Sequence, residues 1–181
     1  MLEKGLTVIK LDKANMQLYL SDLVELEQLV FLKRGHLYST EEWGESHFLA
    51  DLPGKFDLSY GILKGSKLVA FLIVSEPFPG VCHVHRVAVH PKHPGNNIGR
   101  KLMLQVYESW KKMPEYRTIT AIMRTDHKIS LPFAKLLGAK VADKAYMTRQ
   151  FQALGRTDVQ IFDNYFMDTY GISYALIHID K

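Results

Sequence analysis

The chain has 181 residues, of which 47% are hydrophobic and 23% are charged, and its formal net charge is +4. This length predicts a single globular domain over residues 1–181 with a sizeable core, and it is too short for two typical domains. Since no stretch approaches the roughly 20 consecutive apolar residues of a membrane span, and the first residues lack the apolar core of a signal peptide, we expect a cytoplasmic protein with no membrane partner.

The N-terminal half predicts a strand, two helices and three strands. Residues 6–11 alternate as a short strand, and residues 16–31 carry apolar side chains at helical spacing. A second helix is predicted over residues 39–51, because Ser39 and Glu42 have the spacing of a capping box. Three strands follow, separated by the turn compositions Lys64-Gly65-Ser66 and Pro77-Phe78-Pro79-Gly80, at residues 58–63, 68–75 and 81–89.

The C-terminal half predicts two helices and three further strands, which makes seven strands in all. The helices cover residues 98–113 and 129–137, and Gly138 ends the second. The strands are expected at residues 118–123, 145–151 and 174–179.

The segment VAVHPKHPGNNIGRKL, residues 87–102, passes from an apolar strand through a turn into a helix. Gly95, Asn96 and Asn97 precede the first helical residue, Ile98, and Gly99 lies in the first helical turn. The first N–H groups of a helix have no intrahelical acceptor and lie at the positive end of the helix dipole. Small residues let a ligand approach those groups, so this turn is suited to binding phosphate. The alternative is an ordinary capped helix that binds nothing.

The segment resembles the central motif of the GCN5-related N-acetyltransferase superfamily, a Gln/Arg-x-x-Gly-x-Gly/Ala turn between a strand and a helix. The predicted order of elements over residues 5–150 is also that of the family. The resemblance implies an α/β fold, with a mixed, mostly antiparallel seven-stranded sheet that about four helices flank and that splays between strands 4 and 5. It also implies acetyl-CoA (coenzyme A) as the co-substrate, and no metal.

The resemblance further implies which residues bind the cofactor. The strand before the turn offers its backbone to the pantetheine arm, facing residues 120–124, and the amides of the turn hold the pyrophosphate. Two residues near a later motif of the family complete the set. The implied residues are Val87, Ala88, Val89, Gly95, Asn96, Asn97, Ile98, Gly99, Arg100, His127 and Phe133.

The chain departs from the family pattern at several positions. Pro94 stands at the Gln/Arg position and Asn97 at the first glycine, whereas Gly99 matches the second. Ala134 stands where many members carry the Tyr that protonates the leaving thiolate, and His127 where they carry Asn. These departures leave open a domain that binds coenzyme A without catalysis, or with weak catalysis.

His83 and His85 are the predicted catalytic residues. They alternate with Val84, so both side chains are expected on one face of a strand, the face of Val87 and Val89. His83 occupies the place of the general-base Glu in the histone-acetylating branch of the family, and a histidine titrates near neutral pH. The alternative for either residue is a structural histidine with satisfied hydrogen bonds.

Two further residues are candidates for proton transfer. Tyr146, on a predicted late strand, could act as an acid, although most tyrosines in strands only pack. Glu76, at the end of the third predicted strand, is a weaker candidate base, because carboxylates at strand ends are usually only solvated.

The acceptor is expected to be a primary amine of a small molecule or peptide. In this fold the first two helices and their connection line the acceptor side, and here they hold carboxylates and aromatic rings that would suit a cationic amine: His36, Tyr38, Glu41, Glu42, Trp43, Glu45 and Asp51. The alternative is a solvated acidic helix start. The aromatic tail over residues 155–181 either covers the site, pairs with a second subunit in a homodimer, or packs in the core.

The sequence therefore predicts an N-acyltransferase that works by direct attack of the amine in a ternary complex. The alternatives are a coenzyme A-binding regulatory domain and a protein-interaction module without cofactor. The single cysteine, Cys82, excludes an internal disulfide and the cysteine spacings of a zinc site. Basic residues cluster near the turn, but nucleic acid is not an expected partner, because no recognisable nucleic-acid motif accompanies them.

Overall fold

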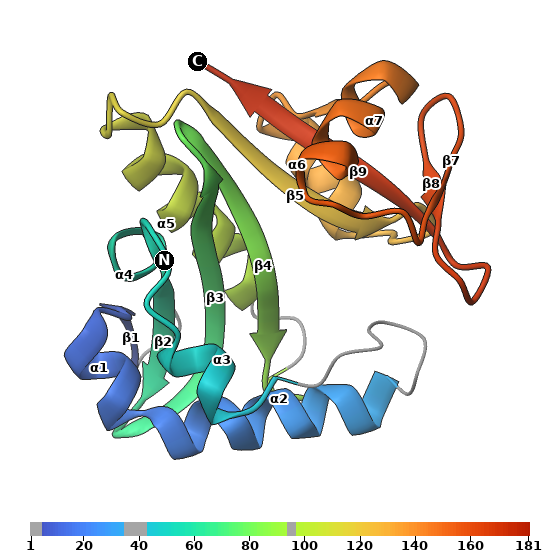
Figure 1. Ribbon diagram of the computed structural model, residues 1–181. Helices are drawn as coiled ribbons and strands as arrows, with labels where there is room; N and C mark the ends of the chain where they lie inside the picture. Colours follow the sequence, from blue (N-terminus) through green and yellow to red (C-terminus); the bar gives the residue numbers. More distant parts are fainter. Residues whose placement is uncertain (1–4, 35–42, 94–96) are drawn as a thin grey trace. The chain divides into compact units, whose positions relative to one another are not determined.

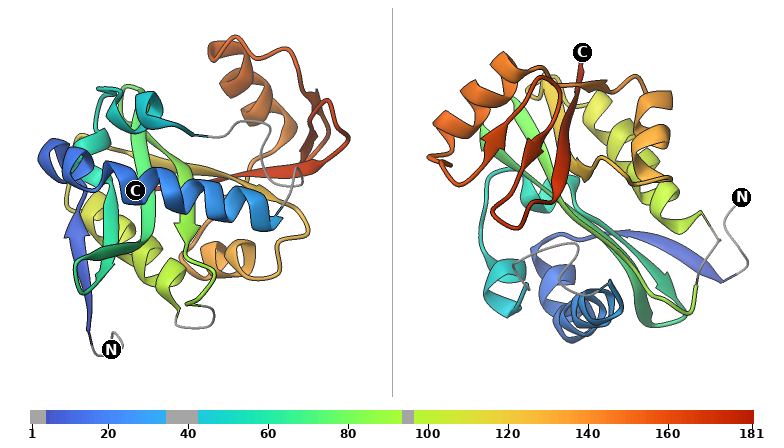
Figure 2. Two further views of the ribbon diagram at one scale, coloured as in Figure 1. Left: turned by 90° about the horizontal axis from the view of Figure 1, so that it is seen from below. Right: turned by 90° about the vertical axis from the view of Figure 1, so that its right-hand side faces the viewer.

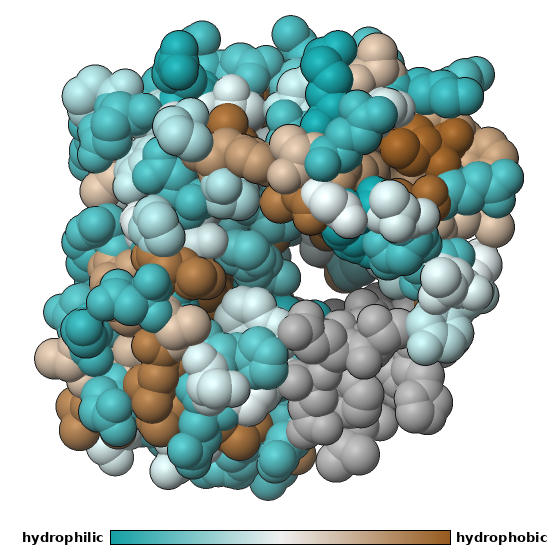
Figure 3. All heavy atoms as spheres, viewed as in Figure 1, coloured by the Kyte–Doolittle hydropathy of each residue, from teal (hydrophilic) through white to brown (hydrophobic). Residues whose placement is uncertain are grey.

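The computed structural model describes residues 5–34, 43–93 and 97–181 (Figure 1). The chain divides into two compact units, Met1–Tyr116 and Arg117–Lys181, and each is described by itself. No helix within the described ranges is long and apolar enough to cross a membrane. The face shown in Figure 3 is mostly hydrophilic, with hydrophobic side chains in scattered groups.

The first unit is an antiparallel sheet with helices on both faces. The sheet has the order β1-β2-β3-β4, and each strand pairs antiparallel with the next. Its strands are β1 (Leu6–Lys10), β2 (Tyr60–Lys64), β3 (Lys67–Phe78) and β4 (Val81–Val89). Its helices are α1 (Lys13–Leu18), α2 (Leu20–Arg34), α3 (Glu45–Leu49), α4 (Lys55–Leu58) and α5 (Ile98–Lys111).

The central strand β3 explains why helices cover both faces. Its apolar run, LVAFLIVS from residue 68 to 75, is buried at every position, as expected of a strand covered on both sides. On one face, Phe71 and Ile73 share a hydrophobic cluster with Leu23 and Leu26 of α2 and with Phe48 of α3. Figure 2 shows α2 and α5 on opposite faces of these strands.

Helix α5 covers the other face because its apolar residues recur every four positions. Ile98, Leu102, Val106 and Trp110 are buried, and they form one stripe of the helix. The hydroxyl groups of Tyr60 and Ser109 lie 2.8 Å apart and join β2 to α5. The predicted helix over residues 98–113 is confirmed.

A β-bulge in β4 changes the face to which its side chains point. Ile73 pairs with Arg86, whereas Val74 pairs with Val84, so His85 is an extra residue on β4. Ala88 belongs to the hydrophobic cluster that Phe71 and Ile73 form with α2, which we call the α2 cluster. Its neighbours Val87 and Val89 therefore point to the opposite face of the sheet, which α5 covers. A Cβ placed on Gly99 of α5 would lie 3.7 Å from Cγ2 of Val89, as this orientation requires.

The bulge corrects one prediction about the two histidines. His83 and His85 share a face, as predicted, but they lie on the α2 side and not with Val87 and Val89. His85 shows this directly, because its ring packs beside Trp43, a member of the α2 cluster. Simple alternation fails because His85 is itself the extra residue of the bulge, so the alternation is interrupted between the histidines and the two valines.

The second unit is an antiparallel sheet built around its last strand. β5 (Thr118–Arg124), β6 (Lys140–Val141) and β8 (Phe166–Met167) each pair with β9 (Ser173–Asp180), and β7 (Gln160–Ile161) pairs with β8. Its helices are α6 (Ser130–Leu136) and α7 (Lys144–Ala153), and Met147 and Phe151 of α7 pack on Leu176 of β9.

Helix α7 overturns the strand predicted over residues 145–151. Asp143 accepts a hydrogen bond from the N–H of Tyr146 at 2.7 Å and caps the helix. The two buried residues Met147 and Phe151 lie four positions apart, which is helical spacing and not strand alternation. Tyr146 therefore lies on a helix.

The predicted fold class, an α/β fold with a mostly antiparallel sheet, is confirmed. The described residues form nine strands where seven were predicted: the strand predicted over residues 145–151 is a helix, and the three strands β6, β7 and β8, of two residues each, were not predicted. The helix predicted at 16–31 is divided at Tyr19, and α4 was not predicted. The capping box of Ser39 and Glu42 lies outside the described residues. The single domain and the splay between strands 4 and 5 stay predictions.

A buried lysine fixes the end of α3. Lys55 is fully buried, and its Nζ donates hydrogen bonds to the carbonyl oxygens of His47, Phe48 and Ala50 at 2.7–2.8 Å. These carbonyls lie at the C-terminal end of α3, where a cation is favoured. Burial lowers the pKa of Lys55 to about 8, and Asp51 opposes this change, so the ammonium group persists at neutral pH.

We expect Lys55→Met to lower the free energy of unfolding by about 2–4 kcal/mol, because three carbonyls, one of them buried and two partly buried, lose their donor. Urea denaturation at pH 7 measures this, with Lys64→Met on the exposed end of β2 as the control. A loss at Lys55 no greater than at Lys64 would contradict the structural role.

Candidate active site

The centre of the candidate site is the pair of histidines on β4. The ring centroids of His83 and His85 lie 5.0 Å apart, and the two rings meet edge to face. Both side chains are partly buried on the α2 side of the first unit. The bulge at His85 places both imidazoles on this side of the sheet.

Ser75 of β3 holds His85. Its hydroxyl oxygen lies 2.6 Å from Nε2 of His85, and Ser75 is only 3% exposed. In the sheet, Ser75 lies opposite His83, but its hydroxyl group bonds to His85, the extra residue of the bulge. The hydrogen bond fixes the orientation of the His85 ring.

Trp43 and a buried ion pair complete the surroundings of His85. The ring of Trp43 lies 6.0 Å from the ring of His85, and on its own segment it stacks on His47 at 5.7 Å. The guanidinium of Arg86 lies 5.6 Å from the Trp43 ring and forms a 2.7 Å ion pair with Glu27 of α2. Glu27 is 4% exposed, so its charge needs this partner.

The pKa of His83 is not the near-neutral value that is ordinary for a histidine and that the sequence led us to expect. Burial, together with the nearby charge of His85, lowers the pKa of His83 to about 3. At neutral pH the His83 ring is therefore uncharged and keeps a lone pair that can accept a proton. It is a weaker base than an exposed histidine, because the charged form is poorly solvated.

The two other predicted proton-transfer residues have structural partners. Glu76 accepts a hydrogen bond from the N–H of Gly80 at 2.6 Å and so stabilises the turn between β3 and β4. The ring of Tyr146, in the second unit, stacks on His178 at 4.6 Å, and burial raises the pKa of its hydroxyl. A role for Tyr146 in catalysis stays a prediction.

The start of α5 supports part of the predicted phosphate turn. Asn97 has a φ of 52°, the left-handed conformation, and it is the one non-glycine residue with positive φ among those described. Asparagine tolerates this conformation better than most residues, so the departure from glycine at this position is compatible with the observed backbone. Its side chain forms no capping hydrogen bond. Gly95 and Asn96 lie outside the described residues.

The first intrahelical donor of α5 is the N–H of Lys101, which bonds to the carbonyl of Asn97 at 2.9 Å. The amides of Ile98 and Gly99 precede it, and an α-helix offers its first amides no intrahelical acceptor. Ile98 is buried, which anchors the turn, and Gly99 presents no side chain. An anion fits the chemistry of this helix start.

The residues implied by the later motif lie in the second unit. Nδ1 of His127 accepts a hydrogen bond from the N–H of Ser130 at 3.0 Å, so this ring caps α6. Phe133 is partly buried on α6, and Ala134 is 2% exposed. The family's tyrosine position is thus filled by a buried methyl group. Contact of His127 or Phe133 with a cofactor stays a prediction.

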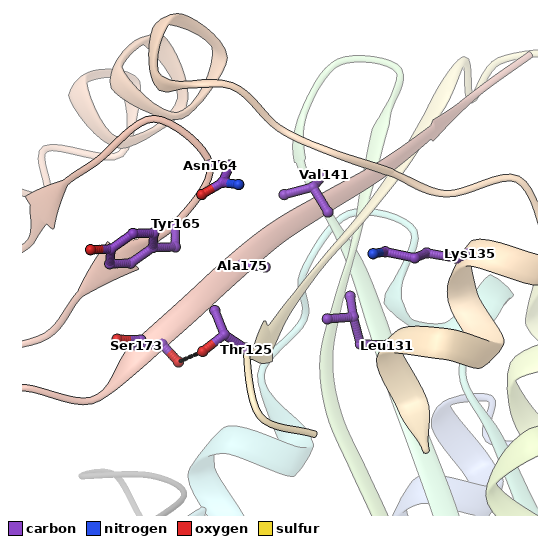
Figure 4. A pocket seen from close by; sticks show the side chains of 8 residues that line it. All are labelled: Thr125, Leu131, Lys135, Val141, Asn164, Tyr165, Ser173 and Ala175. Atoms are coloured by element: carbon purple, nitrogen blue, oxygen red, sulfur yellow. Dashed lines mark hydrogen bonds between the residues drawn. The ribbon is translucent and has the colours of Figure 1, made fainter. Parts of the chain in front are cut away.

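The second unit contains a pocket of about 340 Å³, which is lined by residues other than those predicted for the site (Figure 4). Leu131 and Lys135 of α6 border it, and Thr125 donates a 3.4 Å hydrogen bond to the carbonyl of Ser173 at its edge. Only Lys135 and Tyr165 among its lining residues carry ionisable groups.

Sequence reasoning missed the partners of the histidines, although two signals were present. Ser75 ends an otherwise apolar run in β3, and a polar residue in such a place needs a hydrogen-bond partner. His85 and Arg86 are adjacent polar residues in a strand, which breaks the alternation and indicates a bulge. No local signal in α2 marks Glu27 as buried.

Comparison with known proteins places these observations in a family. Residues 20–139, about two thirds of the chain, match the family described as "Acetyltransferase (GNAT) family". No curated protein matches the sequence.

Solved structures resemble the chain over nearly its whole length. The ribosomal-protein-S18-alanine N-acetyltransferase from Escherichia coli has a TM-score of 0.62 at 16% identity, over 97% of this chain and 93% of its own. PaiA N-acetyltransferase from Thermoplasma acidophilum, in complex with coenzyme A, has 0.63 at 14% identity, over 97% and 99%. Naa50 from Arabidopsis thaliana, with the bisubstrate analogue CoA-Ac-MVNAL, has 0.61 at 11% identity, over 98% and 99%. At these identities the similarity establishes the fold.

The low pKa of His83 predicts a pH-dependent stability. Unfolded His83 takes up a proton near its ordinary pKa of 6.5, whereas folded His83 does so only near 3. The free energy of unfolding should therefore fall as the pH is lowered through this interval, with a contribution that approaches about 1.4 kcal/mol per pH unit.

Urea denaturation of the wild type and of His83→Gln, between about pH 4 and pH 7, measures this contribution. We expect the stability of the variant to fall less steeply with acid. Parallel curves would show that His83 titrates alike in the folded and unfolded states.

Proposed function

This chain belongs to the Acetyltransferase (GNAT) family, and we propose that it transfers an acetyl or other short acyl group from acyl-CoA to a primary amine of a small molecule or peptide. Coenzyme A thioesters are the acyl donors of this family, which agrees with the co-substrate expected from the sequence.

The observation that carries the proposal is the start of α5. Asn97, at the first glycine position of the family motif, takes the left-handed conformation, and the helix that follows offers the amides of Ile98 and Gly99. Backbone amides and the helix dipole stabilise an anion without a basic side chain. We assign the pyrophosphate of coenzyme A to this turn, and the pantetheine arm to the backbone of residues 87–89.

The same strand supports the chemistry, because β4 carries His83 and His85 shortly before the turn. Amide formation requires an uncharged amine, which attacks the thioester carbonyl and must then lose a proton. His83 is uncharged at neutral pH and can accept that proton directly or through a water molecule. Holding amine and thioester together in a ternary complex supplies much of the remaining acceleration.

Protonation of the leaving thiolate needs a source other than the usual tyrosine position, since Ala134 is buried there. Tyr146 keeps its proton at neutral pH, because burial raises the pKa of its hydroxyl, and it remains our candidate acid. Water is the alternative.

Two similar structures support a peptide or protein amine as one class of acceptor. One is a ribosomal-protein-S18-alanine N-acetyltransferase, and the other holds a bisubstrate analogue, CoA-Ac-MVNAL. A small-molecule amine is the other class. The buried Ala134 favours a second candidate function, a coenzyme A-binding domain with weak or no turnover.

Replacement of Gly99 tests the cofactor assignment. Proline removes the amide hydrogen at a position in the first turn, where no intrahelical bond is lost. We expect Gly99→Pro to weaken acetyl-CoA binding by about 10- to 100-fold, the effect of one hydrogen bond to a charged group. Isothermal titration calorimetry measures the affinity.

Gly99→Ala is the matched control, since its Cβ would lie 3.7 Å from Val89, an ordinary contact, and its amide is retained. Its affinity should stay within about threefold of the wild type. Equal affinities for the proline and alanine variants would place the pyrophosphate elsewhere.

Thiol release from acetyl-CoA with a panel of amines tests turnover. We expect His83→Ala to lower kcat by about 100-fold or more, in the range of general-base catalysis, and to leave acetyl-CoA affinity unchanged. A variant with the wild-type rate would remove His83 from the mechanism. A wild type that binds acetyl-CoA but turns over none of the amines would favour the non-catalytic alternative.

A further inference from the structure

The pocket of the second unit lies on the face of the sheet opposite to α7. Leu176 of β9 belongs to the cluster that packs on α7, so its neighbour Ala175 points to the other face. Ala175 lines the pocket, and so does Ser173, two positions before it on the same strand. Helix α6 borders the pocket with Leu131 and Lys135. The pocket is therefore separate from the hydrophobic cluster under α7.

One part of the pocket wall is apolar. Leu131, Val141 and Ala175 line it with aliphatic side chains, and they come from α6, β6 and β9 (Figure 4). Contact with such side chains favours a ligand that has an apolar part, because apolar surface is then removed from water.

The polar side chains of the pocket are available to a ligand. Lys135, Asn164, Tyr165 and Ser173 line the pocket, and their side chains form no hydrogen bond or ion pair with another residue in the part of the chain that the structure describes. Thr125 differs, since its hydroxyl group donates to the carbonyl of Ser173 at 3.4 Å. A ligand can bind these four side chains without breaking a bond inside the protein.

Lys135 determines which charge the pocket favours. Among the lining residues it is the one Lys, Arg, Asp or Glu, and Figure 4 shows its ammonium group extending from α6 toward the space between Leu131 and Val141. A carboxylate in that space would accept a charge-assisted hydrogen bond. A cationic amine would be repelled, and no lining carboxylate would compensate. The pocket thus favours the opposite charge to that of the acceptor amine.

We propose that this pocket binds a small organic carboxylate, whose charged group pairs with Lys135 and whose apolar part contacts Leu131, Val141 and Ala175. Its volume of about 340 Å³ lies near the lower end of the range for small-molecule sites, about 300–1,000 Å³, which suits one compact ligand. The proposal does not depend on acyl transfer, because no residue that we assign to acetyl-CoA or to proton transfer lines the pocket.

Methyl-resolved nuclear magnetic resonance tests the site in the protein without acetyl-CoA, with 3-phenylpropanoate as the probe. We expect saturable shifts of the methyl signals of Leu131, Val141 and Ala175, with a Kd of about 1 mM or tighter. The methyl signals of Ile122, which packs in the α7 cluster, should stay unchanged. Absence of shifts at the three lining residues would overturn the proposal.

The charge of the probe provides a second test. 3-Phenylpropanamide and 3-phenylpropylamine lack the negative charge, and we expect each to bind at least about tenfold more weakly than the acid. Equal affinities for the acid, the amide and the amine would contradict the pairing with Lys135.

Replacement of Lys135 tests its role directly. Its side chain is exposed and has no partner to lose, so Lys135→Gln is expected to fold as the wild type does. We expect it to bind 3-phenylpropanoate about tenfold more weakly or worse, the effect of one hydrogen bond between charged groups. Lys140→Gln is the matched control, because Lys140 is exposed on β6 beside Val141 but does not line the pocket. Similar losses in the two variants would show only a general attraction to basic residues and would overturn the site.

Acetyl-CoA separates this proposal from the proposed function. At saturating acetyl-CoA, the affinity for 3-phenylpropanoate should stay within about twofold of its value in the free protein. If acetyl-CoA displaces the probe, the pocket belongs to the coenzyme site and the separate carboxylate site is overturned. A protein that binds the probe but not acetyl-CoA would contradict the proposed function and leave the carboxylate site standing.

Discussion

One extra residue in β4 governs the chemistry of the first unit. Without the bulge at His85, alternation would place His83 and His85 on the α5 side with Val87 and Val89. With it, the imidazoles face Trp43 and the buried side of α2, while the two valines still flank the start of α5. A single strand thereby presents the two histidines on one face, and on its other face it leads to the helix start that we propose binds the pyrophosphate.

Buried charges around this strand are matched pair by pair. Glu27 and Arg86 neutralise each other at 2.7 Å, and Lys55 satisfies three carbonyls at the end of α3. A buried ion pair of this kind adds little to the free energy of unfolding, but removal of one partner lowers that free energy strongly, because a buried charge is left without a partner. The Glu27–Arg86 pair joins α2 to β4, and Lys55 joins α4 to the end of α3. The ring of His85 is in contact with the hydroxyl group of Ser75 and the ring of Trp43.

Two departures from the family motif differ in kind. Asn97 adopts the left-handed conformation, which asparagine tolerates better than most residues and glycine adopts readily. Ala134 is a buried methyl group, which cannot replace a phenol. The departure at Asn97 is therefore compatible with the cofactor site that we propose, whereas the departure at Ala134 removes the usual proton donor.

The sequence by itself determined the order of most elements, the amphipathic helix α5 and the family, because these depend on local periodicity and on residues close together in the chain. It gave the wrong structure for residues 145–151 and the wrong face for the histidines. The face of a side chain beyond a bulge depends on the register with β3, and the pKa of His83 depends on burial by distant segments. The contacts of His85 with Ser75, and of Arg86 with Glu27, join residues from separate elements. Only the tertiary structure decides such contacts, because pairing and desolvation are properties of segments brought together by folding.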